Sequence, residues 1–136
     1  MKHTRLQHHI RYVDGSLKTV CVTAVLTAIG VRNEAFRKTW NGKRDVWTDV
    51  LRRNGYGVRS RKSKLPKECT VGVARRYIRT FKGDPKGAKY IVRVSGHIML
   101  LDAQGYTVVD TDPRMRDRRL VEKIYMVFDK GGSWPQ

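Results

Sequence analysis

The chain has 136 residues, a length typical of a single domain. Its 29 Lys and Arg against 12 Asp and Glu give a formal net charge of +17, which excludes an acidic disordered segment and predicts a polyanionic partner. No apolar run approaches the roughly 18 residues of a membrane span, and the polar N-terminus MKHTRLQHHI lacks the apolar core of a secretory signal. Two cysteines do not form a disulfide framework, so we expect a reduced, intracellular setting.

The first half of the chain is typical of helices that follow a polar arm over residues 1–18. The run CVTAVLTAI over residues 21–29 is apolar nearly throughout and stops at Gly30, which favours a buried helix with a glycine cap. Apolar stripes at helical spacing and turn residues predict three more helices, over residues 33–40, 44–54 and 70–81.

The second half of the chain changes to the pattern of strands. β-rich runs separated by short glycine-containing turns predict strands over residues 90–94, 97–101, 106–109 and 124–128. Such runs suggest an antiparallel meander. Helices followed by strands predict an α+β domain, in which N-terminal helices pack on a C-terminal antiparallel sheet.

Three residues in this pattern have the side chains of a thiol-nucleophile triad. Cys21 stands at the start of the first helix, His97 opens a strand after Gly96, and Asp110 ends the next strand. A helix N-terminus favours a thiolate over a thiol, and an imidazolium nearby adds to that effect. The carboxylate would orient the ring, and the N–H groups at the helix start would serve as an oxyanion hole.

The motifs TVCVTAVLTAIG, DVWTDVLRRNGYGV and KYIVRVSGHIMLLDAQGYTVVDTDPR resemble the papain-like cysteine peptidase superfamily, and most of all its small bacterial and phage C39-like members. The resemblance covers roughly residues 19–112 and implies one reduced papain-like domain over residues 19–136. It implies Cys21 as nucleophile, His97 as general base and Asp110 as the orienting acid. The family usually has a Gln or Asn several residues before the cysteine; residues 14–20 contain neither, and Gln7 is the nearest upstream.

The function expected from this resemblance is a cysteine peptidase or a related thiol-dependent amide hydrolase, acting on a peptide or protein without a cofactor. A phage origin would place it in the host cytoplasm or the virion. The alternative is a catalytically inactive papain-like protein that binds nucleic acid or an acidic protein. An enzyme needs the three side chains to converge, whereas a binding protein needs only a continuous basic face.

Other residues compete for these roles. Cys69 is a rival nucleophile before the helix expected at 70–81, and Asp102 is a rival acid that fits a hairpin turn better. The histidines His3, His8 and His9 lie on the polar arm without the spacing of a zinc site, so no metal site is expected.

The basic residues are clustered in the sequence, and aromatic residues among them suit single-stranded nucleic acid. No helix-turn-helix, RNA-recognition or zinc-finger signature is present, so any binding would be independent of sequence. The candidate nucleic-acid-binding residues are Arg52, Arg53, Arg59, Arg61, Lys62, Lys64, Arg75 and Arg76.

Overall fold

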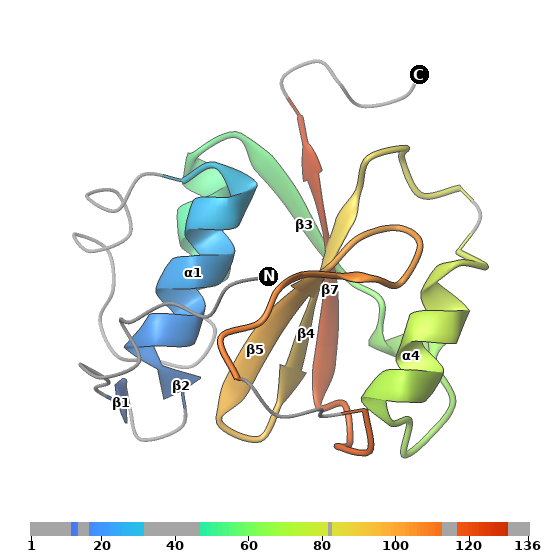
Figure 1. The fold of residues 1–136 in the computed structure, drawn as a ribbon. Helices are drawn as coiled ribbons and strands as arrows, with labels where there is room; N and C mark the ends of the chain where they lie inside the picture. The colour runs from blue at the N-terminus through green and yellow to red at the C-terminus, as the bar shows by residue number, and fades with distance from the viewer. Residues whose placement is uncertain (1–11, 14–16, 32–46, 82, 113–116, 131–136) are drawn as a thin grey trace.

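The computed structural model describes residues 12–13, 17–31, 47–81, 83–112 and 117–130. Over these residues the chain is an α+β domain with a five-stranded antiparallel sheet between helices (Figure 1), which confirms the expected class. Its α-helices in the described part are α1 (Thr19–Ile29), α3 (Trp47–Arg53) and α4 (Val71–Ile78). None of these described helices has the length and apolarity needed to cross a bilayer.

The strands of the sheet follow the order β3-β7-β4-β5-β6 and pair antiparallel throughout. Their bounds are β3 (Tyr56–Ser60), β4 (Lys89–Val94), β5 (His97–Leu101), β6 (Thr107–Val109) and β7 (Lys123–Asp129). The expected meander is therefore present only over β4, β5 and β6. The last strand returns across the sheet and pairs with β4 on the side away from β5.

Strand β3 was not expected, because residues 56–64 are basic and carry little apolar pattern. The structure places β3 at the edge of the sheet, against β7, and follows it with a short 3-10 helix, η2 (Lys62–Lys64). An edge strand has one solvent-facing side, where charged residues are common. Its sequence therefore resembles that of a loop.

Helices cover the sheet on both faces, because its central strands are apolar on both sides. One buried cluster joins α1 and α3 to Ile91, Ile98 and Leu100, and α1 contributes Cys21, Val22, Val25 and Leu26 at helical spacing. The second cluster packs α4 through Val71, Ala74 and Ile78 against Tyr90, Val92 and Met99. Figure 1 shows α1 and α4 on opposite sides of the sheet.

The end of α1 is fixed by a glycine cap, as the sequence predicted. Gly30 has φ of +125°, and its N–H donates to the Thr27 carbonyl at 3.1 Å while that of Val31 donates to Leu26 at 3.0 Å. This pair of bonds is the Schellman arrangement. The Tyr56 hydroxyl donates to the Ile29 carbonyl at 3.0 Å, which ties the helix end to β3.

Two other expected segments differ from the structure or lie outside it. Within the expected arm, β1 (Tyr12–Val13) and β2 (Leu17–Lys18) form a small antiparallel sheet, and β2 leads directly into α1. The helix expected over residues 33–40 lies outside the described residues. Helix α4 is shorter than the expected 70–81: it begins after the Thr70 cap, whose Oγ1 accepts from Val73 N at 3.3 Å, and ends at Ile78.

A buried ion pair joins Arg61, the residue after β3, to the loop before β4. The Arg61 guanidinium donates to both oxygens of Asp84, at 2.8 Å for the shortest bond, and the Tyr90 hydroxyl donates to Asp84 Oδ2 at 2.6 Å. The Asp84 side chain is 5% exposed. Burial alone would raise its pKa, but the bonds from Arg61 and Tyr90 outweigh this effect and hold the pKa below its ordinary value.

We predict that Asp84→Ala lowers the free energy of unfolding by about 3 kcal/mol, because it leaves Arg61 largely buried without its acid. Tyr90→Phe removes one hydrogen bond and should cost about 1 kcal/mol. Urea unfolding at pH 7 measures both. The control is Asp49→Ala, which breaks an exposed pair with Arg52 and should cost well under 1 kcal/mol. Equal losses for Asp84 and Asp49 would contradict the prediction.

Candidate active site

Three candidate residues from distant parts of the chain meet at one end of the sheet. Cys21 is the third residue of α1, His97 is the first residue of β5, and Asp110 directly follows β6. Figure 1 shows that α1 and β5 begin at the same end of the molecule. Contact between α1 and β5 is carried by the apolar cluster that includes Val22, Val25 and Ile98. The core packing therefore brings the helix start beside the strand start.

Hydrogen bonds connect the three side chains through the histidine ring. His97 Nε2 lies 2.7 Å from Asp110 Oδ1, and the Cys21 side chain is a second hydrogen-bond partner of the His97 ring. Because Asp110 occupies Nε2, Nδ1 is the ring nitrogen left for the thiol. Asp110 Oδ1 also accepts from the backbone N–H of Asp112 at 3.0 Å, which holds the carboxylate in place. The same carboxylate oxygen thus contacts the His97 ring and the backbone that follows β6.

The site is largely buried, and its electrostatics favour a charged ring. The His97 and Asp110 side chains are 12% and 15% exposed, and Cys21 is 1% exposed. Burial alone would lower the pKa of His97. The hydrogen bond to the Asp110 carboxylate and the contact with Cys21 outweigh it and raise this pKa to about 9. His97 is the one histidine among the described residues.

The rival residues Cys69 and Asp102 make contacts that belong to the local fold. Cys69 is 2% exposed, its Sγ donates to the Thr70 carbonyl at 3.2 Å, and burial raises the pKa of its thiol. Asp102 accepts from the backbone N–H groups of Gln104 at 2.8 Å and Tyr106 at 3.0 Å, so it stabilises the expected hairpin turn. The residues Gln7, His3, His8 and His9 lie outside the described part of the chain. Within that part, no group of three or more His, Cys, Asp or Glu side chains is arranged to hold a metal ion.

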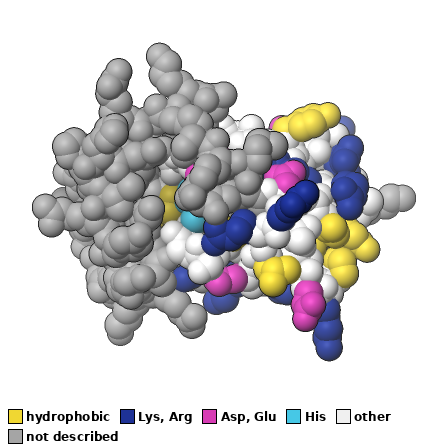
Figure 2. Space-filling model, turned by 60° about the horizontal axis from the view of Figure 1, so that its bottom comes forward, with side chains coloured by type: hydrophobic (Ala, Val, Ile, Leu, Met, Phe, Trp, Pro, Cys, Tyr) yellow, Lys and Arg dark blue, Asp and Glu magenta, His cyan; other side chains and the backbone are white. Residues whose placement is uncertain are grey.

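The eight candidate nucleic-acid-binding residues do not form one surface. Several of them are engaged within the fold. Arg61 pairs with Asp84, and Arg75 pairs with Asp117 at 3.2 Å while donating to the Gly105 carbonyl at 2.9 Å. The Arg52 guanidinium donates to the Val58 carbonyl. Arg75 and Arg76 lie on α4, across the sheet from α3. Near α3, β3 and η2, the structure places Arg52, Arg53, Arg59, Lys62 and Lys64. On the face in Figure 2, basic side chains alternate with acidic and hydrophobic ones.

One charged residue near the site was missed by the sequence analysis. Arg93 is 3% exposed, stands opposite Ile98 in the pairing of β4 with β5, and has its Nε 3.5 Å from Glu122 Oε1. Residues two apart in a strand share a face, so Arg93 lies on the α1 side of the sheet with Ile91. The sequence feature that could have identified Arg93 is an arginine inside the apolar run YIVRV.

Comparisons with protein families, with curated proteins and with solved structures found no match to this chain. The geometry of the described residues is therefore what bears on function.

The pKa of His97 leads to a prediction about stability and pH. A base whose pKa rises from 6.5 to about 9 on folding stabilises the fold fully below pH 6.5, and this contribution is lost as pH rises through 9. We predict that the difference in unfolding free energy between wild type and His97→Gln shrinks by about 3 kcal/mol from pH 6 to pH 9.5. Urea unfolding of both proteins across this range measures it.

The control for this prediction is Asp110→Asn, which keeps the side-chain shape and removes the negative charge. The pKa of His97 should then fall below 9, because burial remains while the hydrogen bond to a carboxylate is gone. NMR titration of the imidazole resonance, assigned by its loss in His97→Gln, reports this pKa directly. An unchanged pKa in Asp110→Asn would show that the Nε2 contact does not stabilise the charged ring.

Proposed function

We propose that this protein is a thiol-dependent amide hydrolase, most simply a cysteine peptidase, with Cys21 as nucleophile. The supporting observation is the convergence of Cys21, His97 and Asp110 from a helix start, a strand start and a strand end into one hydrogen-bonded chain. A charged ring beside the sulfur favours a thiolate, which is the reactive form of cysteine. Papain-like kinship, suggested by sequence motifs, is part of the same proposal.

The proposed reaction has two halves, and His97 transfers the proton in each. The Cys21 sulfur attacks the amide carbonyl carbon, and the imidazolium gives its proton to the leaving amine as the C–N bond breaks. Water then attacks the thioester, His97 accepts a proton from that water, and the C–S bond breaks to release the acid. The thiolate and the imidazolium are restored, so no oxidant or reductant is required.

Stabilisation of the oxyanion would come from the start of α1. Cys21 is the third helical residue, within the turn whose N–H groups point out of the helix N-terminus. Asp110 would act through the ring, holding the tautomer in which Nδ1 faces the sulfur.

We predict that iodoacetamide alkylates Cys21 faster than Cys69 at pH 6 to 7. The two thiols are equally buried, at 1% and 2% exposed, which makes Cys69 a matched internal control for access. Cys21 has a charged imidazole as its partner, whereas burial raises the pKa of Cys69. His97→Ala should remove the difference. Peptide mapping by mass spectrometry measures both rates, and equal, slow labelling in the wild type would contradict a reactive Cys21.

Hydrolysis itself is tested with a mixed peptide library, analysed for new N-termini by mass spectrometry. Cleavage should be present in wild type and absent in Cys21→Ala and His97→Ala. Asp110→Asn should retain a reduced rate with an altered pH profile, because it changes the ring's orientation and charge while leaving nucleophile and base in place. A fast-labelling Cys21 without any cleavage would favour the alternative, a papain-like protein that binds but does not hydrolyse.

A further inference from the structure

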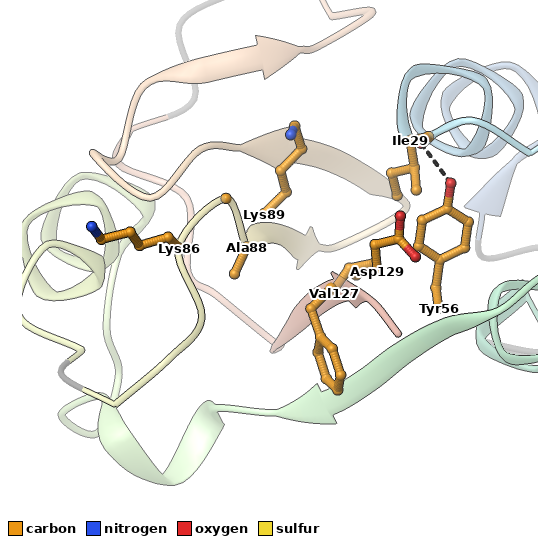
Figure 3. Close-up of a pocket in the computed structure, with 9 residues that line it drawn as sticks. Ile29, Tyr56, Lys86, Ala88, Lys89, Val127 and Asp129 are labelled. Atoms are coloured by element: carbon orange, nitrogen blue, oxygen red, sulfur yellow. Dashed lines mark hydrogen bonds between the residues drawn. The ribbon is translucent and has the colours of Figure 1, made fainter. Parts of the chain in front are cut away.

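Two neighbouring hollows lie at the end of the sheet opposite the candidate active site. The first has a volume of about 260 Å³ and is drawn in Figure 3; the second has about 220 Å³. Tyr56 and Phe128 line both, so the two hollows share a wall. They stand where α1 ends, β4 and β3 begin, and β7 ends.

The charges that line these hollows are mostly positive. Asp129 is the one acidic residue among the lining residues. In Figure 3, Lys86 lies on the loop before β4 with its amine pointing away from Tyr56 and Asp129, and Lys89 lies at the start of that strand. The basic residues that line one hollow or the other are Arg52, Arg59, Lys86, Lys89 and Lys130.

Contacts with the fold hold the side chain of one of these basic residues and the backbone of another. The Arg52 guanidinium donates to the Val58 carbonyl of edge strand β3 at 3.2 Å and lies 3.5 Å from the exposed carboxylate of Asp49. The backbone N–H of Lys130 donates to the Gly55 carbonyl at 3.1 Å, which holds the end of β7 against the turn before β3. Arg59 is exposed on β3. The second hollow therefore has three basic residues around one strand edge, and the Arg52 guanidinium is held in place.

An aromatic ring forms the wall between the hollows. Phe128 is opposite Gly57 in the pairing of β3 with β7, and its ring occupies the space that a Cβ at position 57 would need. Glycine thus allows the ring to lie flat over the strand. Phe128 stays partly exposed on the α4 face of the sheet, whereas Tyr56 lies on the α1 face, where its hydroxyl donates to the Ile29 carbonyl. Proteins that bind single-stranded nucleic acid combine basic residues, which contact the phosphates, with aromatic side chains, on which the bases stack.

We propose that these hollows bind single-stranded nucleic acid, with phosphates on the basic residues beside Phe128, above all Arg59 and Lys130, and bases against the Phe128 ring. Each hollow has room for part of a nucleotide, and the cations line recesses, which fits a flexible strand better than a duplex. The surface is separate from Cys21, because Ile29 at the first hollow is eight residues further along α1, or about 12 Å. It adds a binding activity to the proposed hydrolase and does not depend on it. Of the residues expected from the sequence, Arg52 and Arg59 contribute.

The experiment is a salt titration of binding to a labelled oligothymidylate of about 12 nucleotides, followed by fluorescence anisotropy. Arg59→Ala/Lys130→Ala should reduce the slope of log K against log salt by about 1.4, since each phosphate contact on a single strand contributes about 0.7. The matched control is Lys67→Ala/Arg79→Ala, which removes the same charge from two exposed residues outside the hollows and should leave the slope nearly unchanged.

Two further variants separate the parts of the proposal. Phe128→Leu keeps an apolar side chain over Gly57 and removes the ring, and should weaken binding about five-fold or more. Cys21→Ala should bind like wild type, so failure of the hydrolase proposal and failure of this one are distinguishable. Equal slope losses in the two charge pairs, no binding at low salt, or polyglutamate competing as well as the oligonucleotide would each overturn the proposal.

Discussion

Burial of the central strand β4 on both faces is the constraint from which the rest of the fold follows. Ile91 belongs to the cluster under α1 and α3, while Tyr90 and Val92 belong to the cluster under α4. A strand with apolar side chains on both sides requires a cover on each face. Helices α1 and α4 supply these covers. The position of Cys21 follows from this packing, because the apolar stripe that holds α1 on the sheet also places the start of the helix beside His97.

The sequence predicted the local elements better than their arrangement. Helix α1 and its glycine cap, and strands β4 and β5, were predictable because composition and turn residues act locally. The place of β7 beside β4 was not, since pairing depends on contacts between segments far apart in the chain. The unexpected strand β3 shows the same limit, because an edge strand needs few apolar residues.

The candidate triad was predictable for a reason that does not apply to the basic residues. Cys21, His97 and Asp110 each mark the end of an element, and ends of elements meet where the elements pack. Lysine and arginine carry no such positional signal. Arg61 and Arg75 are therefore indistinguishable in the sequence from exposed neighbours, although they form ion pairs with Asp84 and Asp117. Net charge predicts a kind of partner but not the surface that meets it.

Helix α1 sets a fixed distance between the candidate active site and the basic hollows. Its first turn holds Cys21, and its last residue, Ile29, is tied to Tyr56 on the wall of the basic hollows. The eight residues between them span about 12 Å of rigid helix, roughly the length of four residues of extended chain. Under the two proposals made above, a peptide linked to a strand of nucleic acid in the hollows would present its amide bonds to Cys21 only beyond the first few residues from the linkage. The fixed length of the helix would keep the residues nearest the nucleic acid out of reach of Cys21.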